Sequence, residues 1–306
     1  MDIKIYDLII IGAGPAGITA SVYAARKQLD FLVISLDIGG QAAWSADIEN
    51  YTGYQFISGP ELAQKFQEHM LKYGPALKEN EEVLELVKIG QVIRLKTNKA
   101  DYQARSVIIA SGKKSKELGV TGEKEFKNRG LTYCATCDGP LFAGKDVAVI
   151  GGGNSALDAA LQLIKITRHV YMINSALSLS GDAIMCRKVQ EAVNVTILNN
   201  STVIAVLGDK FVKSVRINSA NQEKELAVQG VFVEIGLIPN SVFAKGVERN
   251  SENEIIVDAR NQTNLAGIFA AGDVTNVPEK QIIIAAGEGS KAVLSVFHYL
   301  SKNNFN

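Results

Sequence analysis

A glycine-rich turn near the start of the chain constrains the fold more than any other segment. Gly12-Ala13-Gly14-Pro15-Ala16-Gly17 follows an apolar run, residues 6–11, that is typical of a buried strand. Residues 18–27 have the composition of a helix, and residues 30–35 form a second apolar run. In such a β-α-β unit the first glycine permits a tight turn, the second lets the backbone approach a pyrophosphate, and the third lets the helix pack on the strand. The alternative, a tight turn without a ligand, is disfavoured by this context.

The residue that would hold the ribose of a dinucleotide departs from the usual pattern. An acidic side chain is expected about 20 residues after the glycines, and the nearest candidate, Asp37, lies slightly late. We therefore expect the loop 37–41 (DIGGQ) to hold the ribose in place of a carboxylate at a strand end.

The same pattern recurs in the middle of the chain. A strand is expected at 145–150, a glycine turn at 151–153, a helix at 155–165 and a further strand at 169–173. The internal duplication predicts an α/β protein with two nucleotide-binding units, of which the second, with its G-x-G-x-x-A motif, usually holds a nicotinamide dinucleotide.

The group that selects between NAD and NADP is missing from the second unit. After the strand, NAD requires a carboxylate for the ribose and NADP requires arginines for the 2′-phosphate. Residues 174–181 (NSALSLSG) contain neither an acid nor a base. Losing two charged hydrogen bonds costs about 3–6 kcal/mol, or roughly two to four decades of affinity. We favour the interpretation that nicotinamide binding has been lost, and the alternative is that Asn174 accepts the 2′-hydroxyl and NADH still binds.

A pair of cysteines is the strongest chemical signal in the chain. Cys134 and Cys137 stand in a C-x-x-C arrangement that can close a small disulfide ring at the start of a helix, where the helix N-terminus lowers a thiol pKa. Asp138 follows directly and can carry the proton that moves when a thiolate leaves, since no histidine is near in sequence. A zinc site would need two more ligands, and there is no second cysteine pair. Cys186, on an expected helix at 183–193, is interpreted as a core thiol.

Length and composition limit the classes of protein that are possible. A chain of 306 residues favours two domains. Lysine plus arginine equals aspartate plus glutamate, 32 each, so no net field favours nucleic acid or a membrane surface. We expect no signal peptide and no membrane span, and hence a cytoplasmic protein. Three cysteines argue against a disulfide scaffold, and no metal site is expected.

The remaining segments can be placed more coarsely. Residues 113–129 are rich in charge and are the best candidate for a hinge between domains. Further expected elements are a helix at 61–73, a strand at 107–110, a hairpin-rich stretch at 203–233, a strand at 267–273 and a long C-terminal helix at 281–300.

Taken together, these motifs resemble the low-molecular-weight thioredoxin reductases over nearly the whole chain. The second half is also similar to the flavoprotein subunit of alkyl hydroperoxide reductase, without that subunit's additional N-terminal thioredoxin-like domains. The motifs that carry the resemblance are GAGPAG (12–17), GGQ (39–41), DIENY (47–51), CATCDGPLF (134–142), GGGNSA (151–156), GVFVEIGLIPN (230–240), GIFAAGD (267–273) and KQIIIAAGEG (280–289).

The resemblance implies a fold, a cofactor and an assembly. The fold is α/β, with two Rossmann-like (three-layer ββα) nucleotide-binding domains, the second inserted in the first. An FAD-binding domain would comprise 1–114 and 242–306, and a redox-dithiol domain that resembles an NADPH-binding domain would comprise 115–241. A homodimer is implied. Cys137 would face the flavin and Cys134 would attack the disulfide of a partner, thioredoxin.

The FAD contacts follow from matching the family's motifs to this sequence. The glycines of the first turn would hold the pyrophosphate, the 34–41 loop the adenosine side, and Asn50 with the 273–282 segment the ribityl chain and the flavin ring. The full set is Gly12, Gly14, Pro15, Ala16, Gly17, Ser35, Asp37, Gly40, Gln41, Asn50, Ser111, Gly112, Gly272, Asp273, Lys280, Gln281 and Ile282.

One departure from the family limits the kinds of electron donor that we expect. In the family, a His-Arg-Arg type signature after the second unit reads NADPH, and this chain lacks it. The chain therefore looks most like the pyridine-nucleotide-independent branch, which includes ferredoxin-dependent flavin thioredoxin reductases. A basic run with Lys113, Lys114 and Lys116 is a candidate docking patch for an acidic ferredoxin.

Three other hypotheses remain open. An NAD(P)H-dependent disulfide reductase would have its flavin reduced by a nicotinamide, and an FAD dithiol oxidase would consume oxygen with small dithiols. A redox-inert nucleotide-binding scaffold would tolerate loss of Cys134.

Overall fold

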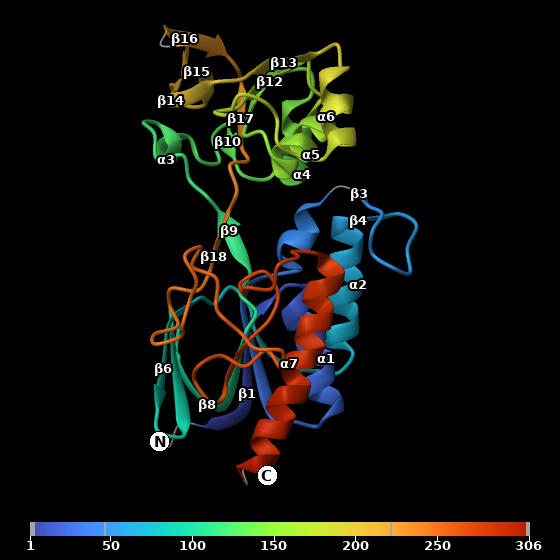
Figure 1. Cartoon of the computed structure of the whole chain (residues 1–306), viewed down its shortest axis with the longest axis vertical. Helices are drawn as coiled ribbons and strands as arrows, with labels where there is room; N and C mark the ends of the chain where they lie inside the picture. Colours follow the sequence, from blue (N-terminus) through green and yellow to red (C-terminus); the bar gives the residue numbers. More distant parts are fainter. Residues whose placement is uncertain (1–3, 46, 221, 304–306) are drawn as a thin grey trace. The chain divides into compact units, whose positions relative to one another are not determined.

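The structure is a computed structural model that describes residues 4–45, 47–220 and 222–303 (Figure 1). Its contacts divide the chain into two units: unit 1 is formed by the segments up to Lys114 and from Ile238 onward, and unit 2 by Ser115–Leu237. The second crossing was expected between 241 and 242 and lies earlier. The reason is that residues just after the crossing pack in unit 1: Ser241 is fully buried and its hydroxyl donates to the Asn253 carbonyl at 2.7 Å.

Unit 1 contains a sheet in the order β5-β2-β1-β8-β7-β6, with β19 paired to β8. The pairs β1–β2, β1–β8, β2–β5 and β8–β19 are parallel, whereas β6, β7 and β8 form an antiparallel meander. The strands of this sheet are β1 (Ile5–Ala13), β2 (Phe31–Ile38), β5 (Ala76–Lys78), β6 (Val83–Ile89), β7 (Val92–Thr97), β8 (Asp101–Ile109) and β19 (Ile268–Ala270).

The two faces of the first sheet are covered by different layers. Leu8 and Ile10 of β1 pack with the helices, while Ile9 and Ile11 pack on the opposite side against the meander and the 244–274 segment. The unbroken apolar run of β1 is therefore a strand buried on both faces, as parallel strands require. The other elements of unit 1 are α1 (Pro15–Arg26), η1 (Gly40–Trp44), β3 (Asp47–Ile48), β4 (Ile57–Ser58), α2 (Gly59–Leu71) and α7 (Ile282–Lys302).

Unit 2 repeats this plan with a five-stranded parallel sheet in the order β10-β17-β11-β12-β13. A three-stranded antiparallel sheet, β14-β15-β16, covers one face, and α4, α5 and α6 supply the core on the other. The strands are β10 (Leu131–Thr132), β11 (Asp146–Ile150), β12 (His169–Ile173), β13 (Val195–Leu198), β14 (Ser201–Gly208), β15 (Val212–Ser219), β16 (Gln222–Ala227) and β17 (Gly230–Val233). The helices are α3 (Glu123–Phe126), α4 (Ala135–Asp138), η2 (Gly139–Phe142), α5 (Asn154–Leu163) and α6 (Ala183–Gln190).

The expectation of a hairpin-rich stretch from 203 to 233 is correct for β14–β16 but wrong for its end. β17 is an interior parallel strand of the second sheet, paired with β10 on one side and β11 on the other. Its four residues are all buried, which matches a strand covered on both faces and not the edge of a hairpin.

The chain passes between the units through two short strands that pair with each other, β9 (Lys113–Ser115) and β18 (Leu237–Pro239). The first crossing, after Lys114, falls within the charged segment expected to act as a hinge. In the part of the chain that the structure describes, no helix has the length and apolar character needed to cross a membrane.

Candidate active site

The first glycine turn is shaped by close backbone contacts. Gly12 has a φ of +104°, and a Cβ atom there would lie 2.3 Å from the Ala110 carbonyl oxygen. A Cβ atom on Gly17 would lie 1.9 Å from the Gly12 carbonyl oxygen. These two glycines are therefore required by the packing of β1, β8 and α1.

Gly14 has a different role, because its Cα faces an open space. A Cβ there would come no closer than 3.9 Å to any neighbouring atom, the nearest being the Gly40 Cα. Gly14 is the N-cap residue of α1, and Pro15, Ala16 and Gly17 form the helix's first turn. A shallow cradle thus lies between the start of α1 and the start of η1, beside a helix end whose first N–H groups have no partner within the helix.

The loop after β2 is tied to this cradle. The Ser35 hydroxyl accepts a hydrogen bond from the Ala13 N–H at 3.0 Å and donates to the Asp37 carbonyl at 2.6 Å. Burial raises the pKa of the Asp37 carboxyl. The Gln41 side chain donates to the Lys113 carbonyl at 3.0 Å. Ser35 and Gln41 therefore hold the loop in position with bonds that the sequence alone does not reveal.

Two further predicted residues are brought together from opposite ends of the chain. The Asn50 amide donates to the Gln281 side chain at 3.0 Å, across 231 positions of sequence. Gln281 is the N-cap residue of α7, whose first residue is Ile282. Gly272, with a φ of +77°, lies close to α1, since a Cβ there would be 3.0 Å from the Ala16 Cβ.

The end of β8 is held in the same region. The Ser111 hydroxyl donates to the Asn240 carbonyl at 2.6 Å, and the Asn240 amide donates back to the Ser111 carbonyl at 3.0 Å. Gly112 follows with a φ of +60°. Because β8 pairs with β1 in parallel, this turn and the Gly12 turn lie at the same edge of the sheet.

A buried charge cluster beside these residues was not foreseen. The Glu254 carboxylate accepts ion pairs from Lys113 at 3.1 Å and Lys280 at 3.0 Å, and its side chain is only 9% exposed. Burial raises the Glu254 pKa, but the bonds from Lys280, Asn250 and Lys113 bring it below its usual value. Burial raises the pKa of Asp273, against the positive charges of Lys280 and Lys113.

This cluster corrects one expectation about the surface. Lys113 was expected to belong to an exposed basic run, but its side chain is 14% exposed and paired with Glu254. It therefore cannot contribute a free charge to a docking patch. No local pattern marks Glu254 as its partner, since the two residues are 141 positions apart.

The two cysteines form the dithiol centre of unit 2. Cys134 and Cys137 are joined by a disulfide, with their Cα atoms 5.4 Å apart. Cys134 is the N-cap residue of α4, and the Cys137 N–H donates to the Cys134 sulfur at 3.1 Å. Because α4 spans only four residues, stabilisation of a thiolate would come mainly from this N–H and not from a long helix dipole.

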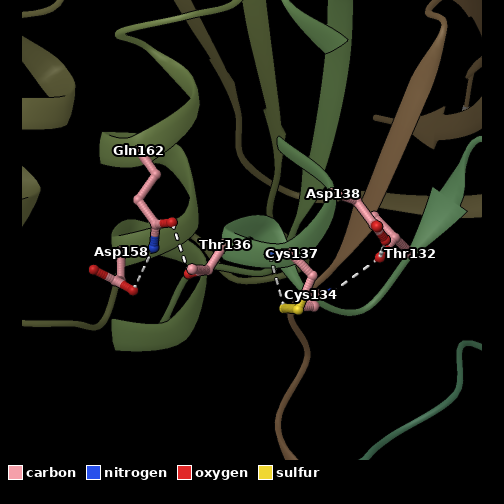
Figure 2. The surroundings of a disulfide bond; sticks show 7 residues. All are labelled: Thr132, Cys134, Thr136, Cys137, Asp138, Asp158 and Gln162. Atoms are coloured by element: carbon pink, nitrogen blue, oxygen red, sulfur yellow. Dashed lines mark hydrogen bonds between the residues drawn. A yellow bond between two sulfur atoms is a disulfide. The ribbon is translucent and has the colours of Figure 1, made fainter. Parts of the chain in front are cut away.

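Asp138 and Thr136 extend the centre in two directions (Figure 2). The Thr132 hydroxyl donates to the Asp138 carboxylate, which holds that side chain beside the cysteine turn. On the other side, the Thr136 hydroxyl donates to the side-chain oxygen (Oε1) of Gln162 at 2.9 Å, and the Gln162 side-chain nitrogen donates to Asp158 at 2.8 Å. The dithiol turn is thus anchored to α5 through side chains that the sequence motifs did not identify.

The second glycine turn has the same close backbone packing as the first, but a different side chain lies beside it. Gly151 has a φ of +137°, and a Cβ there would lie 2.1 Å from the Glu234 carbonyl oxygen. Asn174, at the position expected to select the nucleotide, is 4% exposed. Its amide nitrogen donates to the Ser178 carbonyl and the Asn199 side chain, both at 2.9 Å, and its oxygen accepts from the Ala176 N–H at 3.1 Å.

The residues of unit 1 fit a dinucleotide. A Cβ on Gly40 would approach the Gly14 Cα to 3.2 Å, so side chains would fill the cradle that the two glycines leave open. The helix N-terminus behind it supplies the N–H donors that a pyrophosphate needs. The structure thus offers in unit 1 the features that FAD requires. Within the residues that the structure describes, no group of three or more histidine, cysteine, aspartate or glutamate side chains could hold a metal ion.

Comparison with known proteins agrees with this geometry. Residues 6–289 match the family model described as pyridine nucleotide-disulphide oxidoreductase. The alkyl hydroperoxide reductase subunit of Pseudomonas putida is 42% identical over 98% of this chain, which spans 59% of that protein's length.

Two solved structures cover almost the whole chain. Thioredoxin reductase of Lactococcus lactis superimposes with a TM-score of 0.90 at 33% identity, covering 97% of this chain and 99% of that one. A ferredoxin-flavin thioredoxin reductase from Clostridium acetobutylicum gives a TM-score of 0.54 at 30% identity, covering 97% and 98%. The chain therefore belongs to the pyridine nucleotide-disulphide oxidoreductase family, binds FAD and has the α/β fold of thioredoxin reductase.

Proposed function

We propose that this chain is a thioredoxin reductase that takes electrons from reduced ferredoxin and passes them to thioredoxin disulfide through Cys134 and Cys137. The observation that carries the proposal is the state of Asn174, whose buried side chain is fully engaged by the loop that contains it and by Asn199. Thioredoxin as the partner is supported by the likeness to the Lactococcus lactis enzyme over the full length of both chains.

Asn174 matters because it occupies the position of the missing nucleotide selector at the end of β12. For it to accept a ribose hydroxyl, the amide would have to release bonds to the 176–178 backbone or to Asn199. Each released bond leaves a buried polar group unpaired, at a cost of about 1–3 kcal/mol. That cost offsets the gain from a ribose contact, so the structure favours loss of nicotinamide binding.

The driving force is sufficient for the proposed donor. Ferredoxins near −400 mV lie roughly 130 mV below thioredoxin near −270 mV. For two electrons this difference corresponds to about 6 kcal/mol downhill. FAD, when bound, supplies the chemistry that joins a one-electron donor to a two-electron dithiol.

The residues of unit 2 carry out the exchange with thioredoxin. The Cys134 thiolate attacks one sulfur of the substrate disulfide, that bond breaks, and a mixed disulfide forms. Cys137 then attacks the Cys134 sulfur, which releases the second thiol of the product and restores the disulfide. Asp138, fixed by the Thr132 hydroxyl, is positioned to hold the proton that leaves a thiol.

An NAD(P)H-dependent disulfide reductase is the second candidate. It is supported by the retained glycine turn before α5 and by the family, whose description names pyridine nucleotide. The two candidates differ in which donor reduces the flavin, and that difference can be observed directly.

The test is anaerobic. The holoprotein receives NADH, NADPH or reduced ferredoxin in separate experiments, and the loss of flavin absorbance is followed by stopped flow. We expect ferredoxin to reduce the flavin at least about 100-fold faster than either nicotinamide, in line with the two to four decades of lost affinity. Reduction by NADH or NADPH at a rate equal to that with ferredoxin would replace this proposal with the second candidate.

A further inference from the structure

Glu234 is a titratable residue to which neither the sequence motifs nor the proposed reaction assigns a role. It directly follows β17, and its N–H donates to the Ile150 carbonyl at 2.8 Å. Its own carbonyl oxygen is the atom that a Cβ on Gly151 would strike. The residue therefore sits at the carboxyl edge of the second sheet, packed against the second glycine turn.

The strand register places this residue beside the cysteine turn. β10 and β17 are parallel, with Thr132 opposite Phe232. Cys134 and Glu234 each lie two positions beyond this pair, after the strands have ended at Thr132 and Val233. Figure 2 shows Cys134 and Cys137 between Thr132, the last residue of β10, and Thr136. Cys134 and Glu234 thus follow the adjacent ends of two neighbouring parallel strands.

Within the described residues, no cation compensates the charge of Glu234. Among the residues that the structure describes, its side chain has no hydrogen bond or ion pair, and the charge that acts on it is the Asp158 carboxylate of α5. Across β10, the Tyr133 hydroxyl is bound to Glu123, and Asp138 of α4 is bound to Thr132. Burial raises the pKa of Glu234 to about 8, and Asp158 adds to the rise. Near neutral pH the side chain is therefore mostly protonated.

The dithiol requires a second proton-holding group. Reduction of the Cys134–Cys137 bond to two thiols breaks one S–S bond and takes up two electrons and two protons. The electrons come from the reductant of the enzyme, and Asp138 can hold one proton. We propose that Glu234 is a positioning residue of the dithiol centre, which holds the second proton and keeps the sheet edge uncharged while the Cys134 thiolate forms.

A chain of hydrogen bonds gives this role a second route. The Asp158 carboxylate interacts electrostatically with Glu234. It accepts a hydrogen bond from the Gln162 side-chain nitrogen, and the Gln162 side-chain oxygen accepts one from the hydroxyl of Thr136, which stands between the two cysteines in the sequence. Ionisation of Glu234 would place two carboxylates against each other and act on the dithiol turn through these bonds. The proposal concerns the dithiol alone and does not depend on the donor that reduces the flavin.

The experiment titrates the thiols directly. The holoprotein is reduced with dithiothreitol, separated from it anaerobically, and alkylated with iodoacetamide from pH 5.5 to 10, with Cys134 modification followed by mass spectrometry. In the wild type we expect a second inflection near pH 8, because a newly formed carboxylate raises the thiol pKa. In Glu234→Gln, whose side chain cannot ionise, the second inflection should be absent and the first should stay at its wild-type pH.

Two variants separate this role from a structural one. Asp158→Asn keeps a hydrogen-bonding side chain beside Gln162 and removes the neighbouring charge, so the inflection assigned to Glu234 should move below pH 8. Glu223→Gln, on the exposed strand β16, is the matched control and should reproduce the wild-type profile. Superimposable profiles for the wild type, Glu234→Gln and Asp158→Asn would overturn the proposal.

Discussion

The two glycine turns have the same backbone packing and different surroundings. Gly12 and Gly151 both have positive φ, and a side chain at either would strike a carbonyl oxygen of the neighbouring strand segment, Ala110 or Glu234. The first turn faces an open cradle between Gly14 and Gly40. The second faces Asn174, whose amide oxygen would lie 2.5 Å from a Cβ on Gly152. A glycine motif is therefore retained for packing, whereas its neighbours decide whether a nucleotide can bind.

The loop after β12 also bonds to the second turn. The Ser180 N–H donates to the Gly152 carbonyl at 2.8 Å, and the Asp182 N–H donates to the Asn154 side chain at 2.7 Å. Asp182 in turn caps α6. In unit 1 the comparable edge of the sheet carries the Lys113–Glu254–Lys280 cluster instead. Unit 1 thus keeps paired charged groups beside its turn, whereas in unit 2 the loop after β12 bonds directly to the turn.

The largest expected effect tests whether thiol chemistry depends on unit 2 and FAD binding on unit 1. Cys134→Ser removes the nucleophile of unit 2, and we expect reduction of thioredoxin to fall by at least about 10⁴-fold. FAD content, a property of unit 1, should not change. Cys186→Ser is the matched control, because that thiol is not disulfide-bonded and should leave turnover intact. Residual activity above one percent in Cys134→Ser would show that another group acts as the nucleophile in place of this sulfur.

A pair of alanine variants tests whether only the first turn binds a nucleotide. Gly14 and Gly153 are matched, since each precedes a helix without positive φ and each has room for a Cβ atom. Gly14→Ala should weaken FAD binding by about 10–100-fold, because the methyl group holds a pyrophosphate away from the backbone. Gly153→Ala should leave FAD binding and ferredoxin-driven turnover unchanged. Isothermal titration of the apoprotein with FAD measures the first effect, and equal losses in both variants would refute the comparison.

The sequence could predict the parts of the fold that depend on local patterns. The apolar runs and glycine spacing placed β1, α1 and β2 in unit 1, and the same features placed β11, α5 and β12 in unit 2. The C-x-x-C spacing identified the disulfide. The role of β17 was missed because its four-residue apolar run follows three antiparallel strands and has the same composition as another hairpin strand.

Long-range polar contacts lay beyond sequence reasoning. Glu254 sits in an irregular segment, and nothing near it indicates that it pairs with Lys113 and Lys280. The bond between Asn50 and Gln281 joins residues that only the family resemblance had linked. The sequence pointed to Asn174, but whether its amide is free or engaged depends on Asn199, which follows another strand.

Adding charged side chains beside the second glycine turn tests whether the missing charge or the engaged loop prevents nicotinamide binding. Ser175 and Ala176 are exposed beside the second turn, so arginines there would meet solvent and not the core. The double variant Ser175→Arg/Ala176→Arg should increase the rate of flavin reduction by NADPH by about 10-fold or more, since one charged hydrogen bond contributes about 1.5–3 kcal/mol. Lysines at the same positions add charge without the bidentate geometry and serve as the control. No gain in the arginine variant would mean that the engaged loop, and not the missing charge, closes this site.

The smallest expected effect concerns the stability of unit 2. The pKa of Glu234 is about 8 in the folded protein against 4.5 for the free side chain, so between these values the folded state holds a proton that the unfolded state has released. The free energy of unfolding should therefore fall as pH rises through this window, by up to about 1.4 kcal/mol per pH unit from this residue. Glu234→Gln removes the dependence, and its stability relative to the wild type should grow by about 1 kcal/mol per unit from pH 6 to 7.5. Urea unfolding followed through the circular dichroism of the holoprotein measures the two slopes. Parallel slopes would mean that Glu234 is ionised in the folded protein at neutral pH, and the second turn would then have a fixed negative charge that the first turn lacks.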